Sequence, residues 1–152
     1  MATAYLSLGS NLGEKEQNIT TAIGLLTERV GAILALSRFY ETSPWGYKSE
    51  NGFLNVALGI ETTLPPLALL HTLKQIEVDM GRPPKGNTYQ DRIIDIDILL
   101  YDDLIFESKE LTIPHSLMHK RSFVLQPLNE IAPAVVHPLL NKTISELAFI
   151  FT

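Results

Sequence analysis

The sequence predicts an α+β fold with a βαββαβ order of elements, the ferredoxin-like arrangement in which helices pack on an antiparallel sheet. Two stretches carry apolar residues at helical spacing, and four others are apolar and extended in character. These segments alternate as strand, helix, strand, strand, helix, strand, and extra strands and helices follow toward the C-terminus. A chain of 152 residues suits one domain, so we expect a single domain over residues 1–152.

The first helix is predicted over residues 14–30. Its apolar residues recur at the spacing that places them on one helix face, and Gly31 stands where a helix would end. These residues are Ile19, Ile23, Leu26 and Val30. A short strand over residues 4–8 and a turn over residues 9–11 come before the helix.

Two strands are predicted next, over residues 33–42 and 53–62, joined by a loop that is long for a plain hairpin. A second helix follows, with Thr63 as its expected cap, prolines in its first turn and Gly81 at its end. Its predicted buried stripe consists of Leu69, Leu73, Ile76 and Met80.

The fourth strand, predicted over residues 94–101, contains two carboxylates in an apolar run. An extended strand places Asp95 and Asp97 on one face and the isoleucines between them on the other. Two like charges about 6 to 7 Å apart on a half-buried strand favour a divalent cation, and Mg²⁺ prefers a few carboxylate oxygens plus water and phosphates. The alternative is that both aspartates only solvate a wet sheet face.

A basic loop over residues 81–92 leads directly into this strand and contributes Arg82, Lys85 and Arg92. Cations beside paired carboxylates are typical of a site for metal-bound polyphosphate. Strict strand alternation would turn Arg92 toward the isoleucine face. It can therefore serve the metal side only if the strand begins after it.

The second helix places Lys74 and Glu77 three residues apart, where an exposed ion pair is the plain interpretation. Glu77 is also about one turn from the helix end that faces the basic loop, which makes it a candidate nucleotide contact. On the neighbouring strand, Phe53 and Asn55 share a face, so an aromatic plate and an amide edge suit a flat heterocycle. Alternatively, Phe53 and Phe123 are core residues.

Beyond the fourth strand, we expect edge strands over residues 104–106 and 111–113 and helices over residues 118–125 and 144–151. His115 and Arg121 lie at a transition into a helix, where they could grip a phosphate or a ribose. The competing interpretation is that His115 caps a turn and Arg121 is a solvated helix cation.

The overall charge excludes some classes of function. Twelve Lys and Arg against 17 Asp and Glu give a net charge of -5, which argues against a protein that coats nucleic acid or an anionic membrane. The absence of cysteine excludes disulfides and thiolate metal sites. With no apolar run of membrane-spanning length and no signal-peptide pattern, we expect a soluble, cytoplasmic monomer without nucleic-acid or membrane partners.

Four separate pieces of the chain resemble one family. They are Gly9-Ser10-Asn11, Phe53-Leu54-Asn55, the segment 92–99, and Pro114-His115 followed by Arg121 and Phe123. Together they are similar to the 6-hydroxymethyl-7,8-dihydropterin pyrophosphokinase family of folate biosynthesis. The resemblance implies a ferredoxin-like fold and transfer of pyrophosphate from ATP to the pterin hydroxymethyl group, with release of AMP.

The resemblance also implies roles for individual residues. Asp95 and Asp97 would hold two Mg²⁺ ions with ATP as cosubstrate, and Arg82 and Arg92 would clamp the phosphates, so these four form the implied catalytic set. The implied ATP site consists of Lys74, Glu77, Arg82, Arg92, Ile98, Thr112, His115 and Arg121. The implied pterin site consists of Thr42, Trp45, Phe53, Asn55, Asp95 and Phe123.

Some positions depart from the family pattern. Tyr89-Gln90-Asp91 stands where an aromatic residue, a glycine and a proline are common, and Pro84 replaces a frequent arginine. Phe53 and Ser116 each stand where tyrosine is frequent. Two other functions stay open on the residues alone: a Mg²⁺-dependent phosphohydrolase, and a non-catalytic ferredoxin-like module that binds a small ligand.

Overall fold

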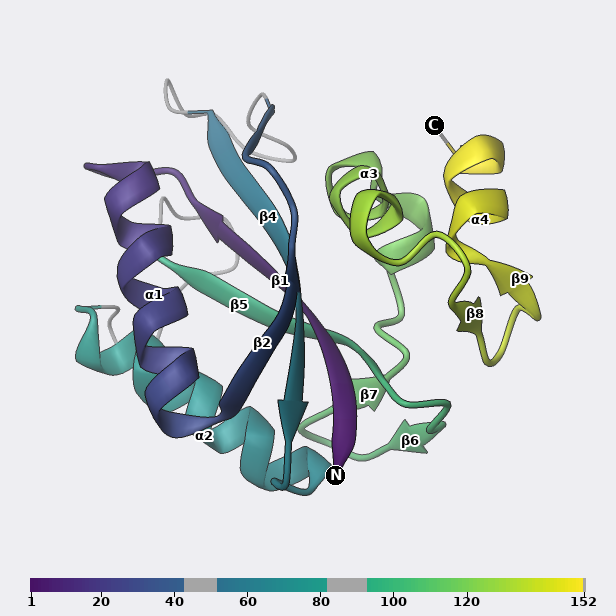
Figure 1. Ribbon diagram of the computed structural model, residues 1–152, viewed down its shortest axis with the longest axis horizontal. Coiled ribbons are helices and arrows are strands. Elements are labelled where there is room, and N and C mark those ends of the chain that lie inside the picture. Colours follow the sequence, from purple (N-terminus) through teal and green to yellow (C-terminus); the bar gives the residue numbers. More distant parts are fainter. Residues whose placement is uncertain (43–51, 82–92, 152) are drawn as a thin grey trace.

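The main sheet of the protein has the strand order β2-β4-β1-β5, with every neighbouring pair antiparallel. The computed structural model describes residues 1–42, 52–81 and 93–151 (Figure 1). The strands are β1 (Ala2–Ser10), β2 (Gly31–Leu36), β3 (Tyr40–Thr42), β4 (Phe53–Thr62) and β5 (Asp95–Tyr101), and β3 extends the sheet by pairing with β4. Helices α1 (Lys15–Arg29) and α2 (Pro66–Asp79) cross between them, which confirms the ferredoxin-like order.

The C-terminal part adds a second group of elements, of which α3 and α4 lie on the side of the sheet away from α1 and α2 (Figure 1). These elements are β6 (Phe106–Glu107), β7 (Thr112–Ile113), the 3₁₀ helix η1 (Met118–Lys120), α3 (Ser122–Ile131), β8 (Val136–His137), β9 (Lys142–Thr143) and α4 (Ile144–Phe151). Strands β6 and β7 pair with each other, as do β8 and β9, so neither pair extends the main sheet. Short strands therefore form near residues 104–106 and 111–113 as predicted, but they pair with each other and do not lie at an edge of the main sheet.

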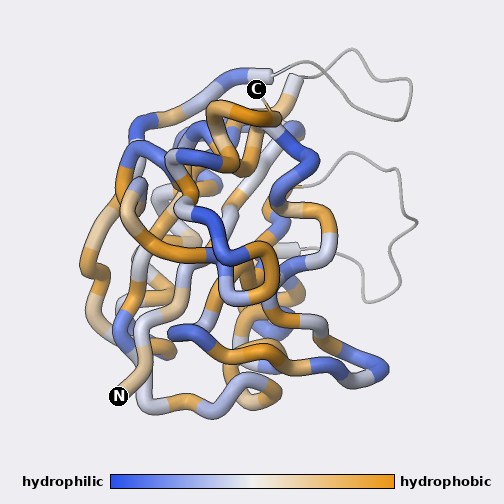
Figure 2. The backbone as a smooth tube through the Cα atoms, turned by 90° about the vertical axis from the view of Figure 1, so that its right-hand side faces the viewer, coloured by the Kyte–Doolittle hydropathy of each residue, from blue (hydrophilic) through white to orange (hydrophobic). Residues whose placement is uncertain are grey.

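Two hydrophobic cores hold these layers together. The first lies between the sheet and helices α1 and α2, and the second joins the opposite sheet face to α3 and α4. Figure 2 views the molecule from the side on which α3 and α4 lie and shows the largely hydrophobic C-terminal helix. Its residues Ile144, Leu147 and Ala148 are buried in the second core.

Strand β5 shows the alternation that the sequence predicts. Ile94, Ile96 and Ile98 are 0%, 5% and 3% exposed and belong to the first core. Asp95 and Asp97 are only partly buried, since they project from the opposite face. This confirms that the two carboxylates share a face.

A β-bulge in β5 marks the boundary between the acidic and the apolar parts of that face. Leu6 pairs with Ile98 and Tyr5 with Leu100, so Leu99 is an extra residue. Leu99 and Leu100 are both buried in the second core as a result. The acidic end of the strand thus lies outside the region where α3 and α4 pack.

Residues 33–42 do not form one strand as predicted, because residues 37–39 separate β2 from β3. The backbone N–H of Ser37 donates to the carbonyl of Ala57, and its hydroxyl accepts from the Ala57 N–H, at 2.9 Å each. The backbone N–H of Arg38 donates instead to the side chain of Glu130, at 3.1 Å. Side chains therefore replace the sheet pattern over these residues.

Three predicted helix boundaries also need correction. Helix α1 ends just before Gly31 as predicted, but Gly31 is not a left-handed cap: it begins β2, where a Cβ would lie 1.8 Å from the carbonyl oxygen of Glu61. Thr63 does not cap α2, whose N-cap is Pro65, although Gly81 ends it with the expected positive φ of 104°. The helix predicted over residues 118–125 is split, because Arg121 is extended (φ -123°, ψ 106°).

No helix in the described ranges 1–42, 52–81 and 93–151 has both the length and the apolar character needed to cross a membrane.

Candidate active site

Polar residues lie in two neighbouring rows across the sheet, on the face where α3 and α4 pack. In one row, Asp97 pairs with Ser7, which pairs with Ala57 of the second core. In the next row, Asp95 pairs with Gly9, and Gly9 pairs with Asn55. Since directly paired residues project to the same side, both carboxylates and the Asn55 amide face one region above the sheet.

Gly9 lets the two halves of this region approach each other. A Cβ at Gly9 would lie 2.9 Å from Asn55 Oδ1 and 3.5 Å from Phe53 Cδ1. The close approach confirms that Phe53 and Asn55 lie on the same face, as strand alternation predicts. The sequence contains no signal for this role of Gly9, because it depends on the register between β1 and β4.

The Asn55 side chain is held in one orientation. It is 3% exposed, and its Nδ2 donates to Thr42 Oγ1 at 3.2 Å. Thr42 itself pairs with Phe53 across β3 and β4. The structure therefore brings together Thr42, Phe53 and Asn55, three of the residues predicted to bind a pterin.

Glu77 lies behind the acidic strand and is only 6% exposed. Its Oε2 accepts a hydrogen bond of 2.7 Å from the backbone N–H of Ile96, the residue between the two aspartates. The interpretation of Glu77 as half of an exposed ion pair with Lys74 is wrong, since Lys74 is exposed and Glu77 is buried. The signal was present in the sequence, because Glu77 follows Leu73 by four residues on the buried helix face.

His115 takes the structural role that the sequence offered as one alternative, while its contact with a phosphate or ribose stays a prediction. Its Nδ1 accepts a hydrogen bond of 3.1 Å from the Leu117 N–H, so it does cap a turn. Burial lowers the pKa of His115, the Arg121 guanidinium lowers it further, and the Asp95 carboxylate acts in the opposite direction. Arg121 and Asp95 are thus the two charged residues whose fields act on His115.

Arg121 and Phe123 come from the start of α3. The guanidinium carbon of Arg121 lies 5.6 Å from the centroid of the Phe123 ring, and both residues are partly buried. Phe123 also packs against the second core. Helix α3 thus supplies a cation and an aromatic ring at the same end.

Other predicted site residues lie at greater remove or beyond the described ranges. Thr112 is exposed in β7, and the Ile98 side chain is buried in the first core on the face opposite the aspartates. Trp45, Arg82 and Arg92 lie outside the described residues, as do Pro84, Lys85 and the segment 89–91. Their proposed roles stay predictions.

The donor set fits a hard divalent cation. Asp95 and Asp97 offer carboxylate oxygens from one rigid strand, and Ser7 adds a hydroxyl directly opposite Asp97. Within the described ranges, no three His, Asp or Glu side chains gather into a metal cage. Such a site leaves coordination positions for water and phosphate oxygens, as Mg²⁺ requires.

The fold and the site together are those of a ferredoxin-like enzyme whose paired carboxylates suit phosphate chemistry. The family model of 7,8-dihydro-6-hydroxymethylpterin-pyrophosphokinase matches residues 5–133. The chain belongs to this pyrophosphokinase family, as the resemblance in its sequence indicated.

Individual relatives agree with the family. A 2-amino-4-hydroxy-6-hydroxymethyldihydropteridine pyrophosphokinase of Porphyromonas gingivalis is 47% identical over 141 residues, which are 91% of this chain and 95% of the relative. The protein of the same name from Aquifex aeolicus is 42% identical over 146 residues, 96% of this chain and 90% of the relative.

A solved structure supports the fold. The crystal structure of Plasmodium falciparum HPPK-DHPS, wild type with pteroate, superimposes with a TM-score of 0.80 at 19% identity. The match covers 99% of this chain and 44% of that one, so this chain spans less than half of that protein.

Proposed function

We propose that the chain carries out the reaction of its family on the sheet face that holds Asp95, Asp97, Asn55 and Phe53. In this reaction the pyrophosphoryl group of ATP is transferred to the hydroxymethyl group of 6-hydroxymethyl-7,8-dihydropterin, in folate synthesis. Family membership favours this transfer over the phosphohydrolase and the non-catalytic module. The observation that carries the placement is that both carboxylates and the Asn55 amide face one region.

The proposed chemistry is an in-line displacement. The hydroxymethyl oxygen gives up its proton to a bound water or an aspartate and forms a bond to the β-phosphorus of ATP. The bond from that phosphorus to the oxygen bridging it to the α-phosphate breaks, which releases AMP. Asp95 and Asp97 would hold two Mg²⁺ ions, which when bound polarise the phosphates and neutralise their charge. Arg82 and Arg92 would clamp the phosphates and oppose the charge that develops in the transition state.

The nucleotide would lie along the outer edge of β5. The Ile96 N–H points outward from the sheet there, because it donates a hydrogen bond to Glu77. Alternate residues of an edge strand turn their backbone groups to the same side, so the N–H and C=O groups of Ile98 also point outward. We therefore assign Ile98 a backbone role in ATP binding. Lys74, Thr112, His115 and Arg121 complete the proposed ATP site.

The pterin would lie over Gly9 and Asn55. The Asn55 amide, held by Thr42, can read the ring nitrogens and carbonyl, while Phe53 from β4 and Phe123 from α3 offer aromatic faces. Trp45 and Asp95 complete the proposed pterin set. Phe53 keeps the ring of the tyrosine that is frequent in the family and lacks its hydroxyl.

Three broader properties remain part of this proposal. We propose that residues 1–152 form one pyrophosphokinase domain that acts as a monomer. The lack of cysteine is consistent with a reducing cytoplasm.

The test is product analysis. The protein is incubated with ATP, Mg²⁺ and 6-hydroxymethyl-7,8-dihydropterin, and the nucleotide product is identified. We expect AMP together with a pterin diphosphate, and no turnover in EDTA or with Asp97→Asn. Release of inorganic phosphate without pterin would instead support a phosphohydrolase.

A matched binding experiment separates catalysis from simple ligand binding. Isothermal titration with a nonhydrolysable ATP analogue is done with and without Mg²⁺ on the wild type and on Asp95→Asn. We expect Mg²⁺ to strengthen binding to the wild type and to have little effect on the variant. Equal affinities under all four conditions would contradict the assignment of the metal site.

A further inference from the structure

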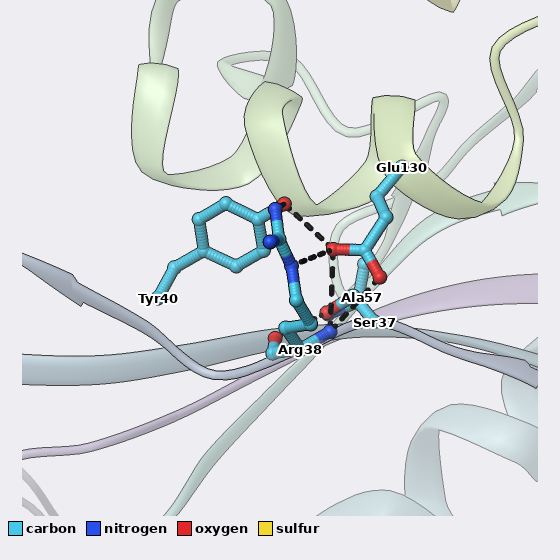
Figure 3. Close-up of polar contacts among 5 residues, drawn as sticks. All are labelled: Ser37, Arg38, Tyr40, Ala57 and Glu130. Carbon is cyan, nitrogen blue, oxygen red and sulfur yellow. Dashed lines mark hydrogen bonds and ion pairs between the residues drawn. The ribbon is translucent and has the colours of Figure 1, made fainter.

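A carboxylate on α3 ties this helix to the segment between β2 and β3 (Figure 3). Glu130 Oε1 accepts a hydrogen bond of 2.6 Å from the Tyr40 hydroxyl and one of 3.2 Å from Arg38 Nε. The backbone N–H of Arg38 donates to Oε2 at 3.1 Å. Ser37 is fixed to Ala57 of β4 in turn, so the contact joins α3 to the sheet.

The contact is charged near neutral pH. The hydrogen bond from Tyr40 is the main reason why the pKa of Glu130 is lowered, and the backbone and guanidinium of Arg38 lower it further. Arg38 also donates to the Tyr40 oxygen at 3.3 Å, with its guanidinium carbon 5.6 Å from the ring centroid. Hydrogen bonds to a charged acceptor are stronger and more directional than neutral ones.

Each end of this contact continues into one wall of the proposed pterin site. On the sheet side, Tyr40 pairs with Asn55, and two residues later Thr42 pairs with Phe53 and accepts from the Asn55 amide. Tyr40 itself is not among the residues proposed to bind the substrate, and its hydroxyl donates to Glu130.

On the helix side, Glu130 follows Phe123 by seven residues in α3. Seven residues are close to two turns, so both side chains project from nearly the same helix face, about 10 Å apart along the axis. Helix α3 packs against both β3 and β4. The position of Phe123 relative to Phe53 and Asn55 therefore depends on how α3 is held at its other end.

We propose that the contact of Glu130 with Tyr40 and Arg38, here called the α3 latch, is a positioning element for the pterin substrate. The latch holds α3 at the distance from β3 and β4 at which Phe123 and Phe53 can both contact a flat ring. The inference rests on the proposed pterin site and adds residues that do not touch the substrate.

The second core gives α3 a separate source of stability. Val124, Leu125 and Leu128 are 5%, 0% and 0% exposed, whereas the Glu130 and Arg38 side chains are 30% and 79% exposed. Removing the latch should therefore leave the helix folded and change its placement. Because a displacement of about 1 Å in a binding site can cost large factors in affinity or rate, a small shift of Phe123 is enough.

The experiment compares Tyr40→Phe, Glu130→Gln and the double variant. The Kd of 6-hydroxymethyl-7,8-dihydropterin is measured by titration calorimetry with Mg²⁺ and a nonhydrolysable ATP analogue present, and the Kd of the analogue is measured alone. We expect each single variant to raise the pterin Kd about tenfold, which is about 1.4 kcal/mol, with little change for the analogue. The double variant should bind pterin no more weakly than the weaker single variant, since both substitutions weaken the same contact between Tyr40 and Glu130.

The matched control is Glu146→Gln in α4. This carboxylate also accepts two hydrogen bonds, from the N–H and the hydroxyl of Thr143 at 2.9 and 3.1 Å, and its contacts do not lead to the site. We expect the control to leave the pterin Kd unchanged, whatever its effect on Tm. A structural role alone would move Tm in both sets and the pterin Kd in neither.

The outcomes are distinguishable. Folded Tyr40→Phe and Glu130→Gln proteins with pterin Kd values within twofold of wild type would overturn the latch, as would equal weakening of pterin and analogue. Loss of folding in both would assign the contact a structural role and also overturn it. Failure of the proposed site has another signature, because then Asn55→Ala would bind pterin like the wild type.

Discussion

Gly9→Ala adds a single methyl group to the sheet surface below the proposed pterin site, here called the floor of the site. The new Cβ would lie 2.9 Å from Asn55 Oδ1, closer than carbon and oxygen approach in well-packed proteins. Asn55 is 3% exposed and is held by Thr42, so its amide cannot simply swing into solvent. We expect the Asn55 side chain to turn away from its place over Gly9.

The magnitude follows from the contacts that must change. Turning the amide breaks one neutral hydrogen bond, worth about 0.5 to 1.5 kcal/mol, and an off-rotamer side chain costs about 0.5 to 1.5 kcal/mol more. Replacing glycine in a strand recovers about 0.5 to 1 kcal/mol. These ranges combine to a net loss of about 0 to 2.5 kcal/mol in the free energy of unfolding; the central value of about 1 kcal/mol corresponds to about 2 to 4 °C in Tm.

The effect on ligand binding should be larger than the effect on stability. The Asn55 amide is the group proposed to read the pterin ring, so we expect the pterin Kd to rise more than about tenfold. Binding of a nonhydrolysable ATP analogue should change little. Calorimetric titration gives both affinities, and urea unfolding gives the stability.

Gly24→Ala is the matched control, because a Cβ at Gly24 in α1 has no heavy atom within 4 Å. It should stabilise the helix by about 0.5 to 1 kcal/mol and leave pterin binding unchanged. The reasoning would be refuted if Gly9→Ala bound pterin as tightly as Gly24→Ala, because a methyl group in the floor would then be harmless.

Three further predictions concern stability. Glu77→Ala removes the acceptor of the Ile96 N–H and should lower the free energy of unfolding in urea by about 2 to 4 kcal/mol. Glu77→Gln keeps an acceptor oxygen and should cost less. Equal costs would contradict the role assigned to this hydrogen bond. Gly31→Ala should cost about 3 kcal/mol or more, because the clash is with the carbonyl oxygen of Glu61, which the sheet holds in place; a near-neutral result would contradict the register. Burial lowers the pKa of three histidines, so below about pH 6.5 the unfolded chain binds more protons than the folded protein. As the pH falls, the free energy of unfolding should therefore decrease by up to about 1.4 kcal/mol per pH unit for each histidine. Urea unfolding between pH 5.5 and 7.5 measures this decrease. The three histidines are His115, His119 and His137. A flat profile in that range would contradict the predicted loss.

Much of the fold could be predicted because its signals are local. Strand alternation places Asp95 and Asp97 on one face without reference to any other residue, and the structure confirms it. The helical spacing in α1 and α2 is likewise contained in each segment. The interruption between β2 and β3 was missed because it depends on Glu130, more than ninety positions later.

The site divides in the same way. The position of Phe53 and Asn55 on one face of β4 was predictable from the sequence. Glu77, in contrast, was interpreted as exposed beside Lys74, although it is buried. A carboxylate on the apolar side of a helix is tolerated only where a donor meets it, and the Ile96 N–H comes from another strand. No pattern within α2 contains that donor.

By itself, the sequence determined the order of the core elements, the shared face of the two aspartates and the family resemblance, since each is written in residues close together along the chain. Only the tertiary structure decided that Gly9 lies close beside the Asn55 amide, that Glu77 supports the acidic strand and that Glu130 ties α3 to β3. These contacts join segments far apart in the chain. Their geometry is set by sheet register and helix packing, which no local pattern of residue types specifies.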